Sequence, residues 1–230
     1  MKLHYETISP LLKEALVKIN KSQLFKDFTL VGGTCLSLQL GHRRSIDIDL
    51  FTDIDYGKMN TKLLKSFLQD NFQYHENLES LNNTLIGYSL RVGDNIRETV
   101  KIDFFYTEKF IFPTIEIDQI KLADPREIAA MKIGAITQDI PRLKDFWDIH
   151  ELSNNYSFRD MVEWGIKRNE WTVSENDIIK GFQKIDHILE PPESIDCLKG
   201  KYWELVKDDL KELIDNYIPT TTCGDKPSNI

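Results

Sequence analysis

The stretch GGTCLSLQLGHRRSIDIDLF, residues 32–51, carries the strongest local pattern in the chain. Residues 28–31 before it are typical of a strand, which the two glycines then break. Residues 34–40 suit a short helix that the next glycine ends. Residues 46–51 alternate apolar and acidic side chains, which predicts a second strand. We therefore expect a strand, a glycine turn, a helix and another strand in succession.

Three acidic residues in predicted strands are candidate metal ligands. Asp47 and Asp49 are two residues apart, so both carboxylates point to one face of their strand. Asp103 lies between the apolar Ile102 and Phe104, where a charge needs a partner. Carboxylate oxygens are the ligands that Mg²⁺ prefers, and Mg²⁺ keeps positions open for substrate phosphates. We expect Mg²⁺, with Mn²⁺ as the alternative; three solvated acids on an exposed sheet face are the other interpretation.

The glycine turn is a candidate phosphate-binding element. Gly32 and Gly33 let backbone amides approach a phosphate closely, and the N-terminus of the following helix favours an anion. The chain has no G-x-x-x-x-G-K-[ST] motif, so this turn is not a P-loop. A tight turn without a ligand is the alternative. The basic cluster at residues 42–44 suits a triphosphate or an RNA end, or else it neutralises the neighbouring acids as an ion pair.

The remaining pattern predicts an α/β (α+β) chain, with a mixed sheet of about five strands and flanking helices followed by a helical C-terminal lobe. Strands are expected over 73–78, 85–92 and 99–106, and helices over 10–19 and 61–71 and from residues 124, 141, 157, 174 and 202 onward. The predicted domains are 1–121 for the catalytic lobe, 122–218 for the helical lobe and 219–230 for a flexible tail. We expect the active cleft between the two lobes.

Composition narrows the function classes. The 230 residues carry 29 Lys and Arg against 37 Asp and Glu, a net charge of −8, which excludes a broadly basic surface for duplex nucleic acid. The three cysteines are widely spaced and form no C-x-x-C pair, so we expect free thiols. Neither a secretory signal nor a membrane-spanning apolar run is evident, so we expect a cytoplasmic protein with no membrane partner. The four tryptophans fall in helical stretches and are expected to pack the second lobe.

Several separated segments together resemble one protein family. Residues 32–51 look like the first motif of the nucleotidyltransferase superfamily, and GHRRSIDID within them is similar to the AbiEii/AbiGii toxin family, whose MenT-type members are nucleotidyltransferases. DPREIAAMKIGAI, residues 124–136, and RLKDFWDIHEL, residues 142–152, resemble the later motifs of that family. The resemblance covers roughly residues 28–152.

The resemblance implies a nucleotidyltransferase-type fold and a site. It assigns catalysis and metal binding to Asp47, Asp49 and Asp103. The nucleotide-binding residues would be Gly32, Gly33, Thr34, Arg44, Ser45, Lys132 and Asp148. The wider superfamily usually has Gly-Ser at the turn, so Thr34 must supply any hydroxyl contact here.

The resemblance also implies an activity, which is metal-dependent transfer of a nucleoside monophosphate from an NTP to an acceptor hydroxyl. The protein would be the toxin of a type IV toxin–antitoxin pair that acts on tRNA 3′ ends and has a cognate antitoxin. The acidic composition favours one alternative, a protein or small-molecule acceptor. A second alternative is a non-catalytic nucleotide-binding or partner-binding module, against which the presence of all three acids argues. For Lys132 and Asp148 the alternatives are a lysine that reaches water from an apolar stripe and a solvated helix face.

Overall fold

The computed structural model describes residues 2–76, 78, 86–189 and 191–219. Apart from Pro219, the predicted flexible tail lies outside these residues, as does Cys223. Cys35 and Cys197 are free thiols, as expected. No helix in the described part of the chain is long and apolar enough to cross a membrane.

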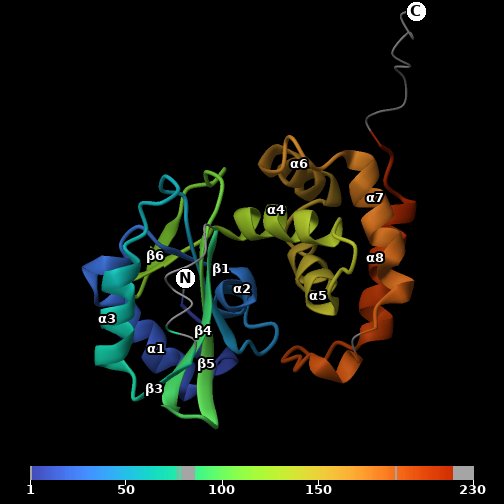
Figure 1. The fold of residues 1–230 in the computed structure, drawn as a ribbon. Helices are drawn as coiled ribbons and strands as arrows, with labels where there is room; N and C mark the ends of the chain where they lie inside the picture. Colours follow the sequence, from blue (N-terminus) through green and yellow to red (C-terminus); the bar gives the residue numbers. More distant parts are fainter. Residues whose placement is uncertain (1, 77, 79–85, 190, 220–230) are drawn as a thin grey trace, which may run out of the picture. The chain divides into compact units, whose positions relative to one another are not determined.

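The chain groups into two compact units (Figure 1). The first unit comprises Met1–Ile128 and Glu193–Lys201, and the second comprises Ala129–Pro192 and Tyr202–Ile230. Residues 122–128 and 193–201, which the sequence analysis assigned to the helical lobe, therefore lie in the first unit. The first unit is built from two separate stretches of the sequence.

A mixed sheet of seven strands forms the centre of the first unit, in the order β3-β4-β5-β2-β1-β7-β6. Its strands are β1 (Thr29–Val31), β2 (Asp47–Thr52), β3 (Tyr74–Glu76), β4 (Gly87–Asn95), β5 (Glu98–Tyr106), β6 (Ile115–Ile117) and β7 (Ile120–Leu122). The pairs β2–β5 and β1–β7 are parallel, and the other four pairs are antiparallel. The mixed α/β class is confirmed.

The expectation of about five strands was wrong because it missed the hairpin of β6 and β7. Each of these strands has only three residues, too few for a clear alternation. The turn between them uses Asp118 and Gln119 at positive φ, 53° and 64°. Such a turn is usually signalled by a glycine, which this sequence does not have there.

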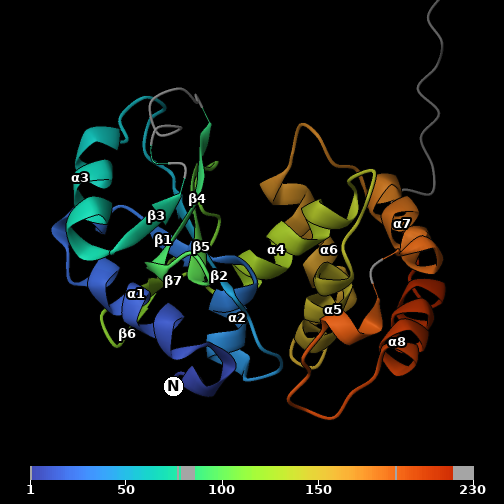
Figure 2. The ribbon, with the colours of Figure 1, turned by 60° about the horizontal axis from the view of Figure 1, so that its bottom comes forward.

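Three helices of the first unit cover the sheet. Figures 1 and 2 show α1 (Pro10–Asn20) and α3 (Thr61–Asn71) on one face and α2 (Gly32–Leu40) on the other. The Ser9 side chain accepts a hydrogen bond from the Leu12 amide at the start of α1, where Pro10 is the first helical residue. Gly41, at φ 64°, ends α2. These starts and stops agree with the sequence pattern.

The two faces of β2 have different environments. Ile48 and Leu50 are buried on the face that α1 and α3 cover, and Ile102 and Phe104 of the neighbouring β5 are fully buried there as well. Alternation along the strand puts the acidic residues of β2 on the opposite face, where α2 packs. The apolar core therefore fixes which way the acids point.

The second unit is helical. Its helices are α4 (Pro125–Ile136), which begins in the first unit, α5 (Leu143–Leu152), α6 (Phe158–Arg168), α7 (Glu175–Gln183) and α8 (Trp203–Asp215). The side chains of Ser157 and Ser174 cap α6 and α7, as their spacing predicted. Short 3-10 helices occupy Tyr5–Thr7, Gln23–Phe25, Lys184–His187 and Pro192–Ser194 of the chain.

Tryptophan packing differs in part from expectation. The Trp147 side chain of α5 is buried and stacks with Trp203 of α8 at 6.5 Å between ring centroids. Trp171, however, is 92% exposed in the loop between α6 and α7, so the expectation that all four tryptophans pack the second lobe was wrong. A loop residue has no periodic pattern that would indicate which way its side chain points.

Adjacent leucines in α3 test which face of this helix stabilises the fold. Leu64 is 1% exposed and Leu63 is 53% exposed. We expect Leu64→Ala to lower the free energy of unfolding by about 3 kcal/mol, because it removes buried methyl groups and leaves a cavity. Leu63→Ala should change it by less than about 0.5 kcal/mol. Urea unfolding followed by circular dichroism measures both; equal losses would contradict the assignment of faces.

Candidate active site

The two glycines after β1 bring charged side chains close to the backbone. Gly32 has φ 69°, a conformation that favours glycine, and a Cβ atom on it would collide with the Asp49 carboxylate. A Cβ atom on Gly33 would collide with the guanidinium group of Arg43. An acidic group thus lies against the first glycine, and a basic group lies against the second.

The strand register brings two of the three predicted acids together. β2 and β5 pair in parallel with Asp49 opposite Asp103 and Asp47 opposite Lys101. Neighbouring strands are about 4.8 Å apart, so the Asp49 and Asp103 side chains leave the sheet side by side. Asp47 precedes Asp49 by two residues and shares its face. Three carboxylates and one lysine therefore share one region of the sheet.

Asp103 is the most buried of these acids, at 9% exposure, and both of its oxygens are occupied. The Ser89 hydroxyl of β4 donates a hydrogen bond to Oδ1, and Lys101 Nζ donates to Oδ2 at 2.6 Å. Neither partner is among the site residues predicted from the sequence. The Lys101 partner was visible as an i, i+2 pair in a strand, whereas Ser89 comes from the neighbouring strand and needs the register.

The donor set fits a hard divalent cation in type. In the described residues, no group of three or more His, Cys, Asp or Glu side chains is close enough together to hold a metal ion. All three acids nevertheless present carboxylate oxygens from one face of β2 and β5, and Lys101 Nζ pairs with the Asp103 carboxylate on that face. The residues therefore match Mg²⁺ in the type of donor atom and in strand position.

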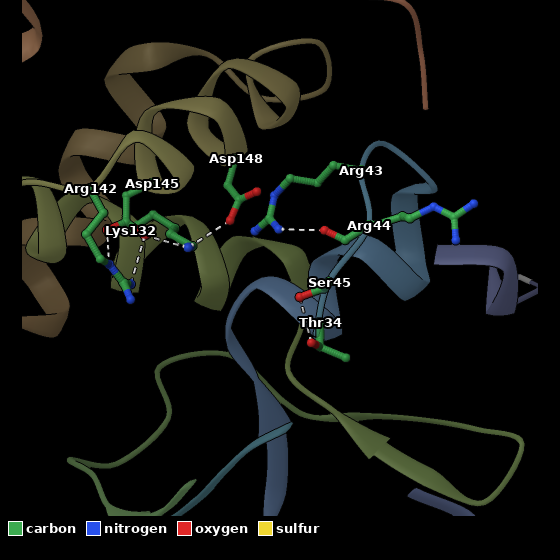
Figure 3. Close-up of polar contacts among 8 residues, drawn as sticks. All are labelled: Thr34, Arg43, Arg44, Ser45, Lys132, Arg142, Asp145 and Asp148. Carbon is green, nitrogen blue, oxygen red and sulfur yellow. Dashed lines mark hydrogen bonds and ion pairs between the residues drawn. The ribbon is translucent and has the colours of Figure 1, made fainter. Parts of the chain in front are cut away.

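Thr34 and Ser45 connect the glycine turn to β2 (Figure 3). The Thr34 hydroxyl forms a hydrogen bond of 2.7 Å with the Ser45 hydroxyl and also donates to the backbone carbonyl oxygen of Asp47. Thr34 is only 1% exposed. Its hydroxyl thus holds the first turn of α2 against the start of the strand that carries the acids.

The neighbouring arginines of the loop before β2 have different environments. Arg43 is 2% exposed, and its Nη1 donates to the Arg44 carbonyl oxygen at 3.1 Å (Figure 3). The Arg44 side chain is 56% exposed and pairs with Asp196 at 2.9 Å. Nucleotide binding by Arg44 stays a prediction from the sequence, and the arginine that lies against Gly33 is Arg43. The loop has no periodicity from which this difference could be predicted.

A buried charged cluster joins α4 and α5 in the second unit (Figure 3). Lys132 of α4 donates to Asp145 at 2.6 Å and lies 2.7 Å from Asp148, and both acids come from α5. The three residues are 6%, 1% and 0% exposed. Arg142 adds hydrogen bonds of 3.1 and 3.2 Å to Asp145. Lys132 and Asp148, two of the predicted nucleotide-binding residues, are thus partners of each other.

The charges in this cluster change the pKa of Asp145. Burial by itself raises the pKa of this carboxyl group, but the positive charges of Lys132 and Arg142 outweigh burial and hold the pKa below its ordinary value. Asp145 is therefore ionised at neutral pH and belongs to a buried ion-pair network that stabilises the second unit.

Two solved structures share this fold. A candidate nucleotidyltransferase from Helicobacter pylori aligns with a TM-score of 0.56 at 13% identity, over 89% of this chain and 90% of that one. JHP933 from Helicobacter pylori aligns with a TM-score of 0.50 at 14% identity, over 89% and 87%. Together with the mixed sheet of the first unit, these alignments show that the fold is of the nucleotidyltransferase type.

Sequence comparison then identifies the family. The model of the nucleotidyl transferase AbiEii toxin family, from type IV toxin–antitoxin systems, matches residues 14–170, which is more than half of the chain. The chain therefore belongs to the AbiEii family. An uncharacterized protein of Aquifex aeolicus is 27% identical over 218 residues, which cover 90% of this chain and 95% of the relative.

The lowered pKa of Asp145 predicts a pH dependence of stability. Because the folded pKa lies below the ordinary value of 3.8, the stabilisation is complete above that pH and is lost as the pH falls through the folded pKa. We expect Asp145→Asn to lower the free energy of unfolding by about 3 kcal/mol at pH 7. Between pH 4 and pH 3, the free energy of unfolding should fall less in this variant than in the unsubstituted protein.

Tryptophan fluorescence during urea unfolding measures this loss, because all four tryptophans lie in the second unit. If the two proteins had parallel stability curves from pH 7 to pH 3, Asp145 would not be the group responsible.

Proposed function

We propose that this protein transfers a nucleoside monophosphate from an NTP to an acceptor hydroxyl, using Mg²⁺ or Mn²⁺ bound by Asp47, Asp49 and Asp103. The observation that carries the proposal is the pairing of Asp49 with Asp103 on adjacent parallel strands, with Asp49 against the glycine turn. Membership of a nucleotidyl transferase family supports the same reaction.

The reaction needs positioning and charge neutralisation more than covalent help from the protein. The acceptor oxygen attacks the α-phosphorus and forms a new O–P bond, while the bond from the α-phosphorus to the bridging oxygen breaks and pyrophosphate leaves. The acceptor proton passes to a base. The candidate base is Asp103, because its carboxylate lies beside that of Asp49.

The residues of the glycine turn have separate tasks in this proposal. The backbone of Gly32 and Gly33 would approach the phosphates, and the lack of a Cβ atom lets the Asp49 and Arg43 side chains lie against it. Thr34 and Ser45 hold the turn against β2 through their hydrogen bond. A divalent cation bound by the three acids would screen the triphosphate charge and polarise the α-phosphate. Contact of Lys132 and Asp148 with the nucleotide remains a prediction.

The acceptor that we propose is the 3′ end of tRNA, and the proposed partner is a cognate antitoxin. The support is the family, which is that of the toxins of type IV toxin–antitoxin systems. A second acceptor class is a hydroxyl on a protein or a small molecule, which the net charge of −8 favours because a tRNA-binding surface is usually basic. Direct labelling of the acceptor distinguishes these classes.

The first test is to incubate the protein with each α-labelled NTP and Mg²⁺, with total tRNA in one reaction and a protein extract in another. We expect label in the tRNA band. Asp49→Asn should lower the labelling rate at least about a thousandfold, because it removes one carboxylate of the acid pair. Addition of a chelator should have the same effect, and excess Mg²⁺ should reverse it.

Each other outcome has a defined meaning. Label in a protein band would replace tRNA by a protein acceptor. NTP binding without label in any reaction would favour the non-catalytic module. Full activity of Asp49→Asn, with circular dichroism unchanged, would contradict the assignment of the acid pair.

Lys101 provides a separate test of the metal site. Its ammonium group neutralises Asp103 at 2.6 Å and therefore competes with a divalent cation for that carboxylate. We expect Lys101→Met to tighten Mn²⁺ binding about two- to fivefold, a small effect because the lysine side chain is 37% exposed and screened by water. Lys109→Met, at an exposed lysine near Asp53, is the control and should leave the affinity unchanged. Weaker Mn²⁺ binding by Lys101→Met would contradict the site.

A further inference from the structure

The glycine turn has a basic end as well as an acidic end. The Asp49 carboxylate lies against Gly32, while the guanidinium group of Arg43 lies where a side chain on Gly33 would be. Arg43 is 2% exposed, which is unusual for an arginine in a loop. The guanidinium group thus fills the space against the Gly33 backbone and places a fixed positive charge at this end of the turn.

The loop that carries Arg43 is held from both sides by backbone hydrogen bonds. The Arg44 amide donates to the Asp196 carbonyl oxygen at 2.8 Å, and the Leu198 amide donates to the His42 carbonyl oxygen at 2.9 Å. Arg43 itself forms an antiparallel bridge with Cys197. Residues 196–198, which we call the strap, therefore fix the backbone on both sides of Arg43. A side chain fixed in this way loses little entropy when it binds a ligand.

From this arrangement we infer that Arg43 binds the β- and γ-phosphates of the nucleotide and makes the site select triphosphates over di- and monophosphates. The inference rests on the proposed function. The reacting α-phosphorus belongs beside Asp49 and Asp103, so the phosphates that follow it are those that reach the Gly33 end of the turn. Arginine presents two parallel N–H donors to two phosphate oxygens, whereas a lysine binds phosphate as a point charge.

The substitution Arg43→Lys tests the inference because it keeps the charge and removes the bidentate group. Calorimetry of the full chain with ATP, CTP, GTP and UTP in Mg²⁺ first identifies a triphosphate that binds. That nucleotide and its di- and monophosphate forms are then titrated into each variant. We expect Arg43→Lys to weaken triphosphate binding about ten- to a hundredfold, the effect of losing charge-assisted hydrogen bonds. Monophosphate binding should change less than twofold.

Arg97→Lys is the matched comparison, since it makes the same chemical change at an exposed arginine in the turn between β4 and β5. We expect less than a threefold change for all three nucleotides, because this side chain is outside the glycine turn and the loop at residues 42–44. Arg43→Gln is the second variant if Arg43→Lys does not fold, and circular dichroism and urea unfolding compare each variant with the unsubstituted protein.

Three results would overturn the inference. The first is an equal loss for the tri-, di- and monophosphate, which indicates a structural role. The second is no loss of triphosphate affinity in folded Arg43 variants, and the third is an equal or larger selective loss in Arg97→Lys. Failure of the unsubstituted protein to bind any of the four triphosphates would be a different result, because it would overturn the proposed function and this inference with it.

Discussion

The parallel pairing of β2 with β5 is the constraint on which the candidate site depends. It sets Asp49 beside Asp103, and a shift of one residue would turn one of these acids into the apolar core. The core prevents that shift, because Ile48 and Phe104 are fully buried on the opposite face. Two adjacent carboxylates repel each other, and the Lys101 ammonium group offsets part of that repulsion. Packing on one face of the sheet thus holds an electrostatically unfavourable arrangement on the other.

The parts of this structure that could be predicted from the sequence are those with local signals. The alternation around Asp47 and Asp49 predicts a strand. Ser157 and Ser174 mark helix starts because their side chains accept hydrogen bonds from nearby backbone amides, and Gly41 marks a helix end through its positive φ. The resemblance to the AbiEii family was confirmed because its motifs are contiguous segments. The fold class and the family could therefore be predicted from short segments of the sequence, without knowledge of how the segments contact each other.

What the sequence could not indicate depends on residues far apart in the chain. The loop with Arg43 and Arg44 is held by backbone hydrogen bonds to residues 196–198, more than 150 residues later in the chain. Lys132 is buried beside two acids of another helix. The sequence pattern alone favoured a Lys132 that reaches water, but a lysine paired with two carboxylates can remain inside. Such partners are set by tertiary packing, which no local pattern encodes.

The strap also affects the order in which the protein can assemble. The chain leaves the first unit after Ile128 and returns to it only at Glu193–Lys201. The loop at residues 42–44 therefore cannot form its hydrogen bonds to Asp196 and Leu198 until helices α4 to α7 have been synthesised. During translation the sheet and the acid pair can form early, whereas the backbone beside the glycine turn is completed only near the end of synthesis.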